Sequence, residues 1–174
     1  MQYSIEKATE ILERTPRILN SFLKGLSVDW TQCNEGENTW SPYDVVGHLI
    51  HGEKTDWMIR LKMIKNNSEK KTFEPFDRFA QFEDSKDKSL DELLIAFAQL
   101  RQNNLDDLES LNISNSDFER KGIHPDLGEV SLKNLLATWV AHDLGHIAQI
   151  ARVMAKQYKA EVGPWVTYLS IINK

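Results

Sequence analysis

Four long segments in which apolar residues recur every three or four positions constrain the fold of this chain most strongly. This period places apolar side chains along one face of an α-helix. The segments run from about Ser4 to Leu26, Pro42 to Lys65, Ser89 to Leu111 and Ser131 to Tyr158. A shorter helix is expected from Trp165 to Ile172, and no segment shows a competing strand pattern. The sequence therefore predicts an all-α fold, a four-helix bundle.

Local signals mark where these helices begin. Ser41, followed by Pro42 and Asp44, supplies a cap, a proline at the first helical position and an acid in the first turn. Ser89 with Glu92 forms a capping box, and Ser131 caps the last long helix. Pro16 lies inside the first segment and should kink or split it, because proline cannot donate the helical hydrogen bond.

Two connections are unusually long. One runs from about Asn66 to Lys88, and the other from about Asn112 to Val130. Loops of this length are uncommon unless they are functional, and either could lie over one end of the bundle. The first carries four aromatic residues: Phe73, Phe76, Phe79 and Phe82.

Length and charge limit the class of protein. The 174 residues suggest a single domain spanning residues 1–174. The net charge is −5 and the 21 Lys and Arg are dispersed, which argues against a nucleic-acid partner. No apolar run could cross a membrane, and no signal peptide is evident. A single cysteine, Cys33, excludes an internal disulfide, so we expect a cytoplasmic protein.

His142 and His146 are the strongest indication of chemistry. They lie four residues apart in the last long segment, so their side chains lie one turn apart on the same side of a helix. They also lie in the middle of the apolar stripe that contains Trp139, whose members fall within about 80° of one another on the helical wheel. Polar groups in a core are costly unless they are bound, which points to an interior metal ion or a hydrogen-bond network.

The second long segment supplies candidates for a third ligand. His48 and His51 are three residues apart, and both could face inward. Gly52 and Thr55 are small enough to leave space beside an ion, and Asp44 could accept the second N–H of His48. The alternative is that these histidines are hydrogen-bonded core residues without a metal. His124, in the second connection, is expected to be exposed.

The pattern is not that of the metalloproteases that carry Glu directly after the first histidine, because Asp143 occupies that position. Asp143 could accept a hydrogen bond from a ligand, act as a base, or pair with a buried Arg or Lys, and the pairing role is favoured. Glu53 lies about 140° from His48 on the helical wheel and should not reach an ion. A three-histidine site could activate a water, polarise a carbonyl or bind a thiolate.

Two stretches of the chain resemble a known family. Thr39–Leu49 (TWSPYDVVGHL) and Leu135–Arg152 (LLATWVAHDLGHIAQIAR) are similar to the two anchor motifs of the DinB-like superfamily, also called the DinB/YfiT group. Phe97–Arg101 and Val162–Trp165 resemble a subgroup of it. The likeness covers nearly the whole chain.

The resemblance implies an up-down-down-up bundle whose divalent metal is held by His48, His142 and His146. Zinc or nickel is the expected ion, and iron, cobalt and manganese would also suit such a site. His51 has no ligand counterpart and becomes a pocket residue. Family members include transferases that use a low-molecular-weight thiol and metal-dependent hydrolases, and many are homodimers.

Three hypotheses follow. The leading one is a metal-dependent enzyme that acts on a small molecule by hydrolysis or thiol transfer, with a metal-bound water or thiolate as the reacting group. The lack of an obvious Glu base slightly favours thiol transfer. The second is a non-catalytic binding or stress-response module, in which His51 or Asp44 closes the fourth position. The third is a metal-free core. Pocket or outer-layer roles are expected for Asp44, His51, Gly52, Thr55, Trp139 and Asp143.

Overall fold

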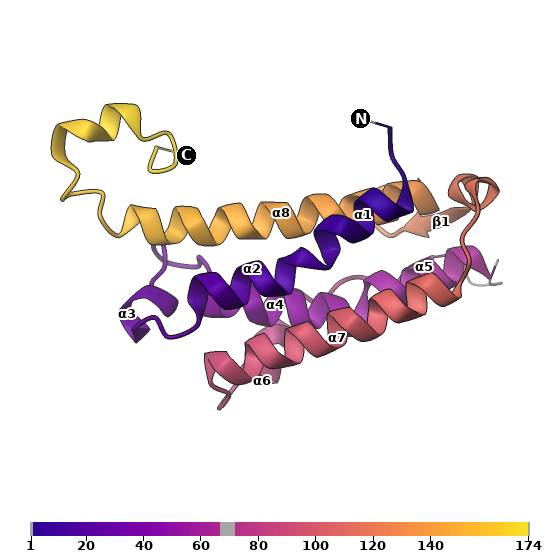
Figure 1. Ribbon diagram of the computed structural model, residues 1–174, viewed down its shortest axis with the longest axis horizontal. Coiled ribbons are helices and arrows are strands. Elements are labelled where there is room, and N and C mark those ends of the chain that lie inside the picture. Colours follow the sequence, from indigo (N-terminus) through magenta and orange to yellow (C-terminus); the bar gives the residue numbers. More distant parts are fainter. Residues whose placement is uncertain (1, 67–71, 174) are drawn as a thin grey trace.

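The computed structural model describes residues 2–66 and 72–173 as a four-helix bundle. The first long helix consists of α1 (Ile5–Leu12) and α2 (Arg14–Leu23), and the second of α4 (Pro42–Thr55) and α5 (Trp57–Lys65). The third is α7 (Leu90–Ser110) and the fourth is α8 (Leu132–Lys156). Figure 1 shows the first and fourth running in one direction and the second and third in the other. This is the up-down-down-up order that the resemblance implied.

The helices begin at the caps that the sequence indicated. The Ser41 hydroxyl accepts from the Asp44 amide at 3.2 Å, while Asp44 Oδ2 accepts from the Ser41 amide at 2.9 Å. Ser89 and Glu92 form the same reciprocal box at the start of α7, and Ser131 caps α8. Each box satisfies backbone donors that the first helical turn leaves unpaired. The cap residues therefore fix the register in which each helix presents its inner face.

Two of the four helices are interrupted. The first breaks at Glu13, three residues before Pro16, which has no N–H to offer the Leu12 carbonyl four residues earlier. That carbonyl instead accepts from Arg101 Nη1 of α7 at 2.8 Å. The second helix breaks at Asp56, where the backbone turns to φ −119° and ψ −75°. The sequence predicted the first interruption and not the second.

The second long connection contains a hairpin that the sequence did not predict. Strand β1 (Lys121–His124) pairs antiparallel with β2 (Gly128–Ser131), which leads directly into α8. Four-residue strands are too short to show an alternating pattern, which is why the sequence shows no sign of them. Gly122 is required in β1 because a Cβ there would lie 2.6 Å from the Phe73 ring.

Short helices occupy the remaining connections and the C-terminal region. They are α3 (Val28–Thr31), α6 (Ala80–Ser85), and the 3₁₀ helices η1 (Asn115–Glu119) and η2 (Gly163–Tyr168). The last replaces the helix expected from Trp165 to Ile172. Within the described residues, none of the helices combines the length and apolarity needed to span a membrane.

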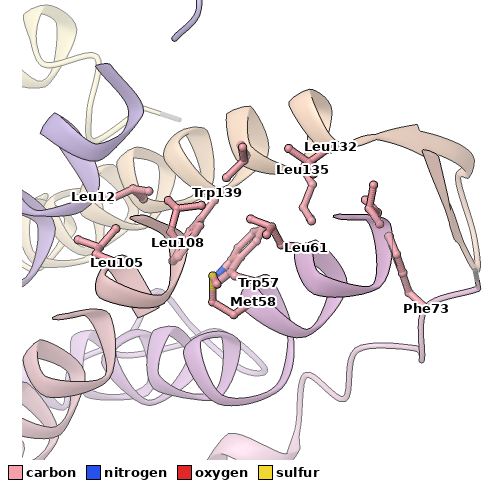
Figure 2. Close-up of a cluster of buried hydrophobic side chains, with 12 residues drawn as sticks. Leu12, Trp57, Met58, Leu61, Phe73, Leu105, Leu108, Leu132, Leu135 and Trp139 are labelled. Carbon is pink, nitrogen blue, oxygen red and sulfur yellow. The ribbon is translucent and has the colours of Figure 1, made fainter. Parts of the chain in front are cut away.

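The hydrophobic core is divided into two clusters. Trp57 and Trp139 stack at the centre of one, with ring centroids 5.6 Å apart and planes inclined by 10° (Figure 2). The other cluster contains Ile50, Phe97 and Ile150. Buried polar side chains lie between these positions along the same helices: Glu53 on α4, Arg101 on α7 and Asp143 on α8. A polar layer therefore crosses the bundle interior.

Candidate metal centre

Three imidazoles from two helices converge inside the bundle. His48 Nε2, on α4, lies 3.1 Å from His142 Nε2, on α8, and His146 Nε2 lies 3.0 Å from the same atom. One ligand atom from each of the three residues lies within 4.8 Å of the others. Zinc–nitrogen bonds of about 2.0–2.1 Å in a tetrahedral site would place ligand nitrogens roughly 3.3–3.4 Å apart. The observed spacing is close to that of a metal site.

Hydrogen bonding among the three rings does not satisfy them. A neutral imidazole carries one N–H and one lone pair, on different nitrogens. His142 Nε2 contacts two other ring nitrogens, but it offers a single proton or a single lone pair, so only one contact can be a good hydrogen bond. A divalent cation would accept a lone pair from all three nitrogens. The donor set therefore fits a bound metal ion.

Burial keeps these histidines neutral. Desolvation, reinforced by the neighbouring His146 and His51 rings, lowers the pKa of His48 to about 3. Desolvation also lowers the pKa of His142 far below its ordinary value, with His146 and His48 adding to the effect. The pKa of His146 is lowered by burial too. Near pH 7 all three rings are unprotonated at one nitrogen, which is the form that binds metals.

The Nδ1 atoms of the three histidines, which point away from the cluster, differ in their hydrogen-bond partners. His146 Nδ1 lies 2.8 Å from Gln149 Oε1, so a proton on Nδ1 can be donated to this oxygen while Nε2 faces the cluster. Within the described residues, Nδ1 of His48 and Nδ1 of His142 are buried without a hydrogen-bond partner. The buried Gln81 side chain of α6 partly opposes the fall in the pKa of His48, although within the described residues its amide makes no hydrogen bond.

Asp44 does not play the role expected of it. Its Oδ2 atom accepts from the backbone amide and the hydroxyl of Ser41, at 2.9 and 2.7 Å, and holds the start of α4. The capping box competes successfully for this carboxylate because Asp44 lies at the third helical position. The expectation that Asp44 accepts the second N–H of His48 was wrong.

Asp143 belongs to the buried polar layer. Arg101 donates to its two carboxylate oxygens, at 2.6 and 3.1 Å, and also to Glu53 Oε1 at 2.8 Å. Trp139 Nε1 donates to the same Glu53 oxygen at 3.2 Å, and the Asn104 amide donates to Oε2 at 2.9 Å. Burial alone would lower the pKa of Arg101, but the two carboxylates raise it above its ordinary value. Of the three roles considered for Asp143 from the sequence, the structure shows the ion pair with a buried arginine.

This layer anchors the ligand helices. Asp143 directly follows His142 on α8, and Glu53 lies five residues after His48 on α4. Because one guanidinium holds both carboxylates, it fixes the rotation and height of α4 and α8 relative to each other. Convergence of the three histidines therefore depends in part on a residue of a third helix.

The remaining predicted residues lie around the centre in different ways. His51 is buried against Phe76, with Nδ1 3.7 Å from Asp84 Oδ2, and does not join the histidine cluster. Gly52 lines the cavity beside the cluster, whereas the Thr55 hydroxyl donates to the His51 carbonyl and lies along a neighbouring cavity. Trp139 packs in the core and not along the cavity. His124 is half-buried at the end of β1.

A cavity of about 370 Å³ opens onto the cluster. Five of its lining residues were not singled out as site residues from the sequence: Trp40, Asp56, Trp57, Phe76 and Arg78. Trp40 directly precedes the Ser41 cap, and Phe76 and Arg78 come from the long connection between α5 and α7. A second cavity, of about 430 Å³, shares Asp56 and Phe76 with the first. Phe76 lies between them, with its ring 5.3 Å from His48 and 5.0 Å from His51.

Asp56 brings a carboxylate to the cavity wall. It occupies the break between α4 and α5, and its Oδ1 atom pairs with Arg60 Nε at 2.6 Å. Burial raises the pKa of Asp56 above its ordinary value, against the opposing effect of Arg60. A carboxylate with a raised pKa is a stronger proton acceptor. Asp56 was not predicted as a cavity residue, because a continuous helix was expected at its position.

An up-down-down-up bundle with a buried three-histidine cluster at a cavity defines a class of helical protein suited to binding a divalent metal. The sequence model of the DinB superfamily matches residues 11–150. The chain belongs to the DinB superfamily.

Solved structures agree on the fold. One is YfiT from Bacillus subtilis, described as a probable metal-dependent hydrolase with an unusual four-helix bundle topology. It superposes with a TM-score of 0.75, at 24% identity and over 90% of each chain. A DinB-like protein, YjoA from Bacillus subtilis, gives a TM-score of 0.53 at 14% identity, over 87% of this chain and 92% of that one. No match was found among curated proteins.

The lowered histidine pKa values predict a pH dependence of stability in the metal-free protein. In the unfolded chain these histidines titrate near 6.5, but in the folded chain they resist protonation to much lower pH. The unfolded state therefore binds more protons below pH 6.5, and the free energy of unfolding should decrease as the pH falls from 7 to 4. Each histidine contributes at most about 1.4 kcal/mol per pH unit.

Urea denaturation of chelator-treated protein at several pH values measures this slope. His142→Asn should flatten it, because one of the buried rings that resist protonation is lost. An equal slope in wild type and His142→Asn would show that the cluster does not resist protonation.

Proposed function

We propose that this protein is a divalent-metal-dependent enzyme that acts on a small molecule. The observation that carries the proposal is the set of three Nε2 atoms, 3.0 and 3.1 Å apart along two contacts, beside a cavity large enough for a small substrate. His48, His142 and His146 would hold the ion. Three protein ligands leave a fourth position available, as in catalytic zinc sites.

The residues around the cavity support hydrolysis as the first reaction to test. A bound zinc or nickel ion would supply Lewis acidity. Trp40, Trp57 and Phe76 give the cavity aromatic walls beside the three histidines. Asp56 offers a carboxylate at the wall that can accept a proton. This carboxylate weakens the sequence-based preference for thiol transfer, which depended on the lack of a base.

Thiol transfer is the second candidate, and one observation favours it. The neighbouring cavity of about 430 Å³ meets the first at Asp56 and Phe76. Together the two would accommodate a bulky low-molecular-weight thiol whose sulfur reaches the histidine cluster. A thiolate held at a metal needs no separate base to stay deprotonated.

The surroundings of the centre support an enzyme over a structural ion. A closed site would need a fourth protein ligand, and His51 and Asp44 were the candidates for it. His51 lies outside the cluster, and Asp44 is engaged by Ser41. A cytoplasmic location and a homodimer, expected from the sequence, stay predictions.

Metal analysis and a probe of the fourth position test the proposal. Protein purified without a histidine tag should bind about one zinc or nickel ion per chain. The visible spectrum of the cobalt-substituted protein should change when acetohydroxamate or a small thiol is added, because the added ligand alters the coordination. Fewer than about 0.2 ions per chain after incubation with either metal would refute the proposal. Full uptake with an unresponsive cobalt spectrum would indicate a structural ion.

A further inference from the structure

Arg78 is an unpaired cation on the wall of the metal-site cavity. It belongs to the connection between α5 and α7 and lines the cavity together with Trp40, Phe76 and the three histidines. Among the described residues, no hydrogen bond or ion pair engages its guanidinium, and its charge acts on His48. By comparison, Arg60, Arg101 and Arg152 are each paired with carboxylates. Arg78 is exposed, and its guanidinium at the cavity is available to a ligand.

The other charge on the cavity wall does not cancel that of Arg78. Asp56 also lines the cavity, but its Oδ1 atom is paired with Arg60 at 2.6 Å. The remaining lining residues are neutral histidines, aromatic side chains and Gly52. The cavity therefore combines a net positive character, which a divalent ion would increase, with apolar walls.

We propose that Arg78 binds a carboxylate of the substrate, whose reacting group lies at the histidine cluster. Arginine presents a planar pair of donors that matches a carboxylate, and the bond is strengthened by the charges on both groups. The aromatic walls would contact the apolar part of the molecule that connects its two ends. The substrate class is thus a small molecule with a carboxylate at one end and a metal-reactive group at the other. This assignment depends on the proposed function.

Two matched metal-binding probes test the role of Arg78. Succinic acid monohydroxamate carries a carboxylate opposite its hydroxamate, and the corresponding monoamide has the same shape without the charge. Calorimetric titration of zinc-loaded protein should give a Kd about tenfold lower for the carboxylate probe. Arg78→Gln should remove this preference without changing the affinity for the amide probe. Arg78→Lys should keep part of it.

Arg17→Gln is the control variant. Arg17 is exposed on α2, away from the metal-site cavity, and its replacement changes the net charge by the same amount. The Arg17→Gln variant should prefer the carboxylate probe over the amide probe as strongly as wild type does. Equal binding of the two probes, or a preference that survives in Arg78→Gln, would overturn the assignment of Arg78. Normal zinc uptake without binding of either probe would also overturn the assignment of Arg78. Failure to bind zinc at all would instead refute the proposed function on which the assignment depends.

Discussion

Replacing His142 with alanine is expected to abolish zinc and nickel uptake while leaving the helix content nearly unchanged. His142 Nε2 contacts both other ligand nitrogens, at 3.1 and 3.0 Å, so its loss leaves two histidines that no longer share a neighbour. The metal Kd should rise by more than roughly 100-fold, which is the upper end of what losing an outer partner of a ligand costs. Elemental analysis and calorimetry measure uptake, and far-ultraviolet circular dichroism measures helix content.

The bundle should survive this change because its core is built from other residues. The two apolar clusters consist of Leu, Ile, Val, Phe, Met and Trp side chains. His142 makes no hydrogen bond outside the histidine cluster among the described residues. His51→Ala is the matched control, since His51 is more deeply buried than His142 but lies outside the cluster, and it should retain metal uptake. Unfolding of the His142 variant would indicate a structural ion, and normal uptake would contradict the ligand assignment.

The long helices and their starting points could be predicted because both depend on local chemistry. Caps such as Ser41 with Asp44 and Ser89 with Glu92 act within one turn, and amphipathic periodicity is written along a single segment. The break at Asp56 could not be predicted in this way. No proline or glycine occupies that position, and the neighbouring stack of Trp57 on Trp139 is a contact between two helices that one segment does not reveal.

The candidate site was predictable to the extent that its residues repeat along a helix. The spacing of His142 and His146 placed both on the inner face of α8, and His48 was found by searching the inner face of another helix. Gln149, Gln81 and Arg78 were not found, because their relation to the histidines depends on rotamers or on the path of a long connection. The sequence also could not show that His48 joins the cluster and His51 does not, because this depends on the orientation of α4 about its own axis relative to α8.

Asp44 and Asp143 show how competition between partners decides the role of a carboxylate. Both lie on a ligand helix close to a histidine. Asp44 sits in the first turn, where unpaired backbone donors engage it, and Asp143 faces a guanidinium from another helix. Helical spacing gives the direction of a side chain and not the nearest donor. Residues of the buried layer, such as Arg101, have to be identified from the tertiary structure.

Replacing Arg101 with methionine is expected to cause the largest loss of stability of any single change discussed here. Arg101 is 1% exposed, and it donates to the buried carboxylates of Asp143 and Glu53 and to the Leu12 carbonyl. Methionine donates no hydrogen bond, so the two buried carboxylates would lose their arginine partner. The Leu12 carbonyl would also lose its donor, because Pro16 has no N–H to replace it. Removing one partner of a buried ion pair typically costs about 3–5 kcal/mol of unfolding free energy. Urea denaturation monitored by circular dichroism measures the loss.

Two further variants separate the burial of charge from the loss of a side chain. Arg152→Met removes a partly exposed ion pair with Glu35, and it should cost less than Arg101→Met because solvent and Lys156 still compensate the Glu35 charge. Adding Glu53→Gln and Asp143→Asn to Arg101→Met removes the two uncompensated charges and should recover part of the lost stability. A cost for Arg101→Met no larger than that for Arg152→Met would contradict the role assigned to the polar layer. Because the Arg101 guanidinium also ties α4 to α8, Arg101→Met should bind zinc more weakly than wild type even under conditions where it remains folded.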